Sequence, residues 1–135
     1  MFEKDYLMRM FLQLGYILRK SWLGHFDNSF EELEEIENAI GDAVDMDHKL
    51  MFSLTPESVV SMLQIGDFDP ELGGYIVRAL FYEADLLEKL GRIGTADLRR
   101  AQANAIAEAY SVDVSIADAS PEALEEYFKQ LEEPT

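Results

Sequence analysis

A short motif that begins helices occurs three times in this chain. Residues 55–57, 69–71 and 120–122 each place a side-chain oxygen of Thr, Asp or Ser before a proline and then a glutamate. The oxygen can cap free backbone N–H groups, the proline fits the first helical position, and the acid favours the positive end of the helix dipole. The motif therefore predicts helices that begin at residues 56, 70 and 121.

The apolar residues between these starts recur every three or four positions, which is the spacing of one face of a helix. Ser29 followed by Glu32 predicts a capping box for the second helix, and Thr95 predicts a weaker cap for the fifth. We therefore expect an all-α fold of about six helices in antiparallel pairs. The predicted helices span residues 3–23, 29–46, 56–65, 70–90, 95–111 and 121–132.

Length and composition predict one domain, residues 1–135. A chain of 135 residues with 48% hydrophobic side chains can bury a core without disulfides, and this chain contains no cysteine. The lack of cysteine excludes thiolate metal ligands and cysteine nucleophiles, and it is typical of a reducing cytoplasm. Within the domain we distinguish an apolar N-terminal helix (1–23), a helix pair (70–111) and a short tail (133–135).

Acidic side chains dominate, with 27 Asp and Glu against 11 Lys and Arg and a formal net charge of −16. Such a surface repels phosphate backbones, so we expect no nucleic-acid partner. The first helix has the opposite bias, because its basic residues outnumber its acids. This asymmetry predicts a segment that docks on its own domain, on a second copy or on a membrane surface. The basic residues are Lys4, Arg9, Arg19 and Lys20.

The first helix is apolar around most of its circumference. A broad apolar arc contains Leu14 and Leu18, and a second apolar strip lies beside it. This pattern predicts burial on two sides, either as a central core helix or as a helix with one face on the domain and the other on a partner. Methionine and aromatic side chains are enriched at such contacts. The predicted interface residues are Met8, Leu12, Tyr16 and Trp22.

We predict neither a signal peptide nor a membrane span at the N-terminus. Glu3 and Asp5 interrupt its start, and its longest uncharged run, residues 10–18, is far shorter than the ~20 residues that span a bilayer. A helix lying among lipid headgroups, with its basic side chains against anionic lipid, is an alternative. The acidic body opposes that alternative, so we expect a cytoplasmic protein without a membrane partner.

Residues 77–110 resemble one tetratricopeptide unit, in which small side chains let two antiparallel helices pack closely. The residues that carry the resemblance are Ala84, Leu87, Leu90, Gly91, Ala96 and Ala103. Arg100 stands where such a unit usually has an aromatic residue, and Glu108 where it has a proline. The opening MFEKDYLMRM is also similar to the start of a family of uncharacterised bacterial helical proteins. That resemblance implies a helical, cytoplasmic, bacterial protein and no particular activity.

Two acidic groupings have the composition of metal sites. Asp42, Asp45, Asp47 and His48 lie close together, but the pattern lacks the second half of a two-sided site. Residues 67–71 are similar to the start of a calcium loop, but the required glycine and bidentate glutamate are misplaced. No phosphate loop, nucleophile elbow or zinc motif occurs. We therefore predict no metal, no cofactor and no catalytic residues.

The body of the chain has one basic cluster, formed by Arg92, Arg99 and Arg100. These arginines could bind a phosphate or carboxylate, or they could balance neighbouring acids. The acidic run 31–37 is either a solvated helix face or a docking surface. We favour a small adaptor or regulatory subunit, not an enzyme, that binds another protein or itself. A ligand-binding or enzymatic helical domain, with a pocket near Arg99 or Arg100, is the remaining alternative.

Overall fold

The computed structural model describes residues 2–66, 68 and 73–112, without the side chains of residues 2–8, 11 and 22. Within these residues the fold is all-α, as predicted. The predicted helix start at residue 70, the predicted helix over 121–132 and the tail 133–135 lie outside the described residues. The helices are α1 (Phe2–Trp22), α2 (Ser29–Ala43), α3 (His48–Ser53), α4 (Pro56–Ile65), α5 (Gly73–Lys89) and α6 (Ile93–Ala109).

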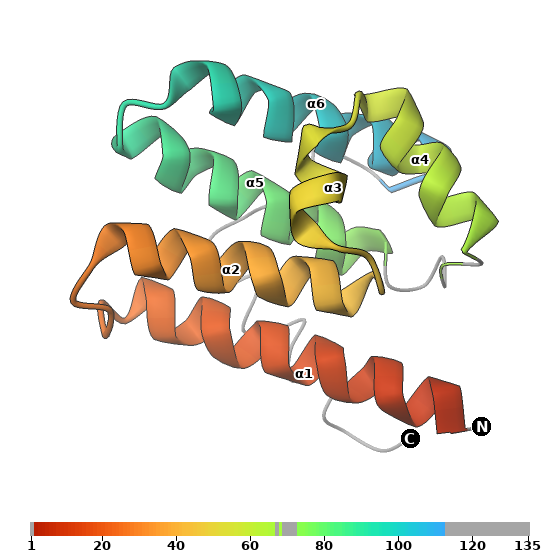
Figure 1. Cartoon of the computed structure of the whole chain (residues 1–135), viewed down its shortest axis with the longest axis horizontal. Helices are drawn as coiled ribbons and strands as arrows, with labels where there is room; N and C mark the ends of the chain where they lie inside the picture. The colour runs from red at the N-terminus through yellow and green to blue at the C-terminus, as the bar shows by residue number, and fades with distance from the viewer. Residues whose placement is uncertain (1, 67, 69–72, 113–135) are drawn as a thin grey trace.

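The four longest described helices lie side by side in one layer, in the order α1, α2, α5 and α6, and alternate in direction (Figure 1). The short helices α3 and α4 lie in front of this layer, and α4 packs against α6. The closest packing joins α5 with α6 and α1 with α2. The predicted antiparallel helix pairs are therefore confirmed for the described residues.

The main hydrophobic core lies where the layer meets the two short helices. Every described helix supplies at least one buried side chain to it. Small residues contribute to the contact between α5 and α6: Ala84, Ala96 and Ala103 are fully buried, which lets the two backbones approach closely. This is the packing expected of the predicted pair, whose tetratricopeptide likeness stays a prediction. The largest fully buried side chains include Leu14, Leu18, Ile36, Ile40, Met51, Leu63, Tyr75, Leu80 and Ile106.

The start of α4 forms as its sequence predicts. The Thr55 side chain accepts a hydrogen bond from the Ser58 backbone N–H at 3.3 Å, and Pro56 is the first helical residue. The prediction for α2 was wrong by one residue, because Asn28 and not Ser29 is the cap. Asn28 Oδ1 accepts from the backbone N–H groups of Phe30 and Glu31, at 2.8 and 3.3 Å. Asparagine caps helices as well as serine does.

The start of α6 also differs from the sequence prediction. The helix begins at Ile93, and no side chain forms a capping hydrogen bond at Arg92. Thr95 therefore lies inside the first turn. The preceding turn is made by Gly91, whose φ of +81° is in the left-handed region that glycine adopts without strain.

Helix α3 was not predicted, and the second helix ends three residues earlier than expected. The chain leaves α2 after Ala43, and the Asp47 carboxylate then caps α3 by accepting from Lys49 N–H at 2.8 Å. Six residues form less than two helical turns, so α3 is too short to produce a clear apolar period.

Gly41 makes the sharp turn after α2 possible. The Met46 N–H donates to the Gly41 carbonyl at 2.9 Å, which folds the chain back onto the end of α2. A Cβ at Gly41 would lie 2.7 Å from the Met46 carbonyl oxygen and 3.0 Å from His48 Cβ. Only glycine leaves enough space for this approach, so the turn requires a glycine at position 41.

Candidate functional site

Among the α1 side chains that the structure describes, exposed apolar and basic residues occur together at the C-terminal end of the helix. Tyr16 is 63% exposed and Leu23 is 56% exposed, although Leu14 and Leu18 on the opposite face are fully buried. We call this surface the terminal patch, and its residues line a shallow hollow of about 180 Å³. The terminal patch consists of Tyr16, Arg19, Lys20, Leu23 and His25.

Leu23 continues the helical pattern by donating from its N–H to the Arg19 carbonyl at 3.1 Å, and the chain reversal that follows brings His25 next to the helix. Gly24 N–H donates to the Ser21 carbonyl at 3.0 Å, and His25 N–H donates to the Lys20 carbonyl at 3.1 Å. Gly24 has a φ of +75°, which is typical of a glycine that ends a helix. The Lys20 Nζ then lies 4.3 Å from the centre of the Phe26 ring. Leu23 and His25 therefore extend the surface of α1 past its last helical residue.

A partly buried polar contact joins the end of α1 to two other helices. The Ser21 hydroxyl donates to Glu32 Oε2 at 2.5 Å and lies 2.7 Å from the Tyr82 hydroxyl oxygen. Burial raises the pKa of Tyr82, the Ser21 hydrogen bond lowers it, and the Glu32 charge raises it again. This contact joins α1, α2 and α5, so the terminal patch is held by three helices.

The four predicted interface residues have different outcomes. Tyr16 is exposed, as a contact residue must be, whereas Leu12 is half-buried. Met8 and Trp22 belong to α1, but their side chains lie outside the described part of the structure. Leu23 was not among the predicted interface residues, although it lies inside the predicted helix 3–23 and follows Tyr16 by seven residues, which places both on one helix face. The interface itself stays a prediction.

A buried ion network centres on Arg99, which is only 4% exposed. Its Nε donates to Glu83 Oε2 at 3.2 Å, and its Nη2 donates to Glu37 Oε2 at 3.3 Å. Its Nη1 donates to the Phe52 carbonyl at 3.2 Å, and the guanidinium carbon lies 4.1 Å from the centre of the Phe52 ring. One side chain of α6 therefore connects α2, α3 and α5.

Two carboxyl groups share this one buried cation. Burial, a hydrogen bond with Glu37 and the Glu37 charge together hold the pKa of Glu83 well above its ordinary value of 4.5, although Arg99 lowers it. Glu83 is fully buried and Glu37 is partly exposed. The arrangement favours a proton on Glu83, which leaves the positive charge of Arg99 balanced by the negative charge of Glu37.

Gln102, also fully buried, extends the network to the end of α3. Its Oε1 accepts from Arg99 Nη1 at 3.4 Å, and its Nε2 donates to the Leu54 carbonyl at 2.9 Å and to the Met51 carbonyl at 3.4 Å. These bonds satisfy carbonyl groups that a helix end leaves free. The network therefore holds α3 against α5 and α6.

Arg100 has a different environment from its neighbour. Its Nη2 lies 3.1 Å from Asp85 Oδ1 and 2.9 Å from Glu88 Oε2, and both acids are more than half exposed. Arg99 and Arg100 thus both balance acids of the same chain. The third arginine of the predicted cluster, Arg92, lines a separate hollow of about 370 Å³ between α2, α3 and the start of α6.

The acidic residues near the α2–α3 turn are not brought together with a histidine. Asp42, Asp45 and Asp47 line one recess, and His48 lines the separate hollow beside Arg92. The Asp47 carboxylate is used to cap α3. Among the described residues, no group of three or more His, Cys, Asp or Glu side chains is arranged to hold a metal ion.

No protein-family model, curated protein or solved structure matches this chain. The similarity of its opening residues to a bacterial helical family therefore stays a prediction. In the part of the chain that the structure describes, no helix combines the length and the apolar character needed to cross a bilayer.

Proposed function

We propose that this chain is a protein–protein interaction module, a small cytoplasmic adaptor or regulatory subunit, and that the terminal patch is its contact surface. The observation that supports the proposal is the exposure of Tyr16 and Leu23 beside Arg19, Lys20 and His25. Full burial of one such apolar side chain contributes about 1.5–3 kcal/mol. Two of them, held on a rigid helix end, form the apolar centre with a polar rim that contact surfaces have.

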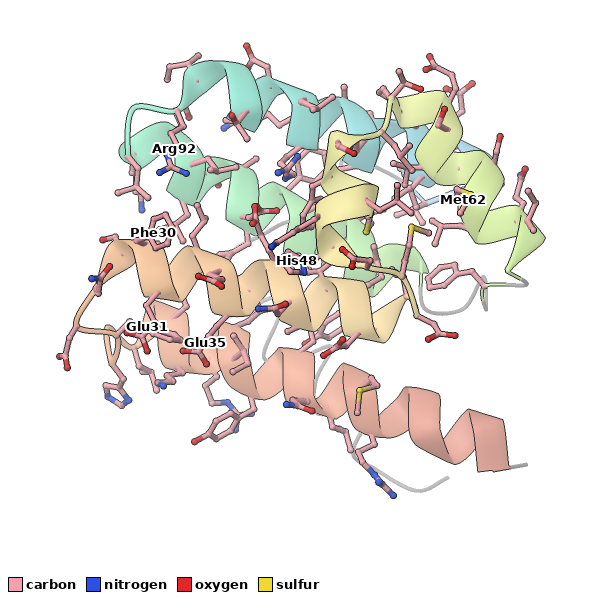
Figure 2. The ribbon with its side chains drawn as sticks, in the orientation of Figure 1. Phe30, Glu31, Glu35, His48, Met62 and Arg92 are labelled. Carbon is pink, nitrogen blue, oxygen red and sulfur yellow. The ribbon has the colours of Figure 1, made fainter. Side chains whose placement is uncertain are left out.

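A second copy of the chain is a partner that suits the arrangement of charges at the terminal patch. Two copies with a net charge of −16 repel each other overall, so the attraction comes from local pairing of opposite charges. Glu31 and Glu35 lie on α2 beside the end of α1 (Figure 2). A surface with acids and bases side by side can pair with itself across a twofold axis, because each sign then meets the opposite sign.

The test compares two variants that introduce negative charge at exposed apolar residues. Tyr16→Glu with Leu23→Glu alters the terminal patch, and Ile65→Glu alters α4, where Ile65 is 81% exposed. Sedimentation equilibrium at micromolar concentration measures self-association, and circular dichroism checks that each variant remains helical. We expect the wild type and Ile65→Glu to associate and the terminal-patch variant to be monomeric.

A partner of another sequence would give a different pattern. In that case the wild type is monomeric, and a protein captured from the native cell by both the wild type and Ile65→Glu is lost with the terminal-patch variant. Identical self-association and identical captured proteins for all three chains would contradict the proposal.

A further inference from the structure

The hollow of about 370 Å³ between α2, α3 and the start of α6 is separate from the terminal patch. Phe30 and Arg92 lie near one end of it and His48 toward the other (Figure 2). Its volume is at the lower end of the range of about 300–1,000 Å³ for small-molecule sites. The hollow can therefore hold a small molecule but is too small to enclose a folded segment.

The deeper wall of the hollow is formed by buried side chains. Leu33 and Phe52 line it and are 4% and 7% exposed. The Phe52 ring is backed by the Arg99 guanidinium, which the buried network holds in place. A preformed wall loses little conformational entropy when a ligand binds, and this favours ligand binding in the hollow.

The charges around the hollow favour an anion. Glu37 lines it, but its carboxylate is bonded to Arg99, so its charge is already balanced inside the protein. Lys49 and Arg92 also line the hollow, and within the described residues neither side chain forms an ion pair. Glu34 is the one exposed acid of the lining. Two unpaired cations against one acid are notable in a chain with a net charge of −16.

Phe30 adds an apolar surface beside these cations. It stands in the first turn of α2, and its side chain is 62% exposed although it lines the hollow. We propose that the hollow binds a small organic anion with a planar apolar part. Its carboxylate or phosphate pairs with the Arg92 guanidinium, Lys49 adds to the positive potential, and the planar part packs on Phe30 against the wall formed by Phe52.

The test uses aromatic ligands of opposite charge. Naphthoate and phenyl phosphate represent the two anionic groups, and naphthylmethylammonium is the cationic counterpart of naphthoate. Binding is measured at neutral pH and low salt by calorimetry and by shifts of backbone amide resonances. We expect both anions to saturate the site and to shift the resonances of Phe30, Lys49 and Arg92, and we expect the cation to bind at least tenfold more weakly.

Variants that each remove one positive charge test the residues. Arg92→Gln is expected to weaken naphthoate binding about tenfold or more, and Lys49→Gln to weaken it severalfold. Arg9→Gln removes the same charge from an exposed position on α1 and is expected to leave the affinity unchanged. Unsaturable binding of both anions, equal binding of the cation, or equal loss in Arg9→Gln and Arg92→Gln would each overturn the proposal. None of these outcomes affects the terminal-patch proposal, because the two surfaces share no residue.

Discussion

Replacing Arg99 with methionine removes the buried guanidinium and keeps most of the apolar length of the side chain. In the native protein this guanidinium donates to Glu83, to Glu37 and to the Phe52 carbonyl, and it is almost inaccessible to water. After the replacement, these acceptors lose a donor that solvent cannot replace at the fully buried Glu83. The variant is therefore expected to fold with lower stability.

The size of the loss follows from burial. Removing one partner of a buried ion pair costs about 3–5 kcal/mol, because the other charge is left without compensation. The charge left here is that of Glu37, which is partly exposed, so this part of the loss is smaller than for a fully buried pair. The protonated Glu83 carboxyl and the buried Phe52 carbonyl each lose a hydrogen-bond donor, which costs about 1–3 kcal/mol for each group. We expect a total decrease of about 3–5 kcal/mol in the free energy of unfolding, a large part of the about 5–15 kcal/mol typical of a domain.

The measurement is urea denaturation followed by circular dichroism at neutral pH. Arg100→Met is the matched control, because it makes the same chemical change one residue away. The acids that pair with Arg100 are 53–70% exposed, so that variant is expected to lose less than about 1 kcal/mol. If Arg99→Met were as stable as Arg100→Met, the network would not be a major source of stability and our reasoning would be refuted.

Three further predictions concern single residues. The pKa of Glu83 is raised in the folded chain, so the folded chain keeps a proton that the unfolded chain releases when the pH rises above about 4.5. The stability that this proton contributes is therefore lost as the pH rises from about 4.5 to the folded pKa. Glu83→Gln is expected to lose that dependence in urea titrations across this pH range, whereas the exposed control Glu108→Gln should retain it. Gly41→Ala should cost about 1–3 kcal/mol by the same denaturation assay, because its Cβ would meet a backbone oxygen at 2.7 Å, and Gly94→Ala, whose Cβ would meet no atom within 4 Å, should cost nothing. Thr55→Ala should cost about 0.5–2 kcal/mol through loss of the α4 cap, and an unchanged midpoint would contradict the capping role.

Local signals predicted much of the fold. The Thr-Pro-Glu motif and the apolar spacing after it locate α4 with its observed limits, Pro56–Ile65. The apolar arc of the first helix predicted the burial of Leu14 and Leu18, and both side chains are fully buried. The errors occur where two local signals compete, as at Asn28 and Ser29, or where an element is too short to show a period, as in α3.

The candidate sites were less predictable. Tyr16 was identified because it lies on an apolar strip away from Leu14 and Leu18, and its exposure shows that the strip reaches the surface. His25 joins it only through the reversal at Gly24, which the helical pattern does not describe. The hollow beside Arg92 is formed by three segments that are distant in sequence, so no local motif predicts it.

The amino-acid sequence was enough to predict an acidic, all-α protein, the limits of α4 from its cap and proline, and the buried face of α1 from apolar spacing. These signals act over three or four residues, which is the range of one helical turn. The contact between Glu37 and Arg99, which are 62 residues apart, depends on how the helices pack, and so does the difference between the buried Arg99 and Arg92, which lines a hollow. The environment of a charged side chain depends on which helices surround it, and helix packing joins residues that no local pattern relates.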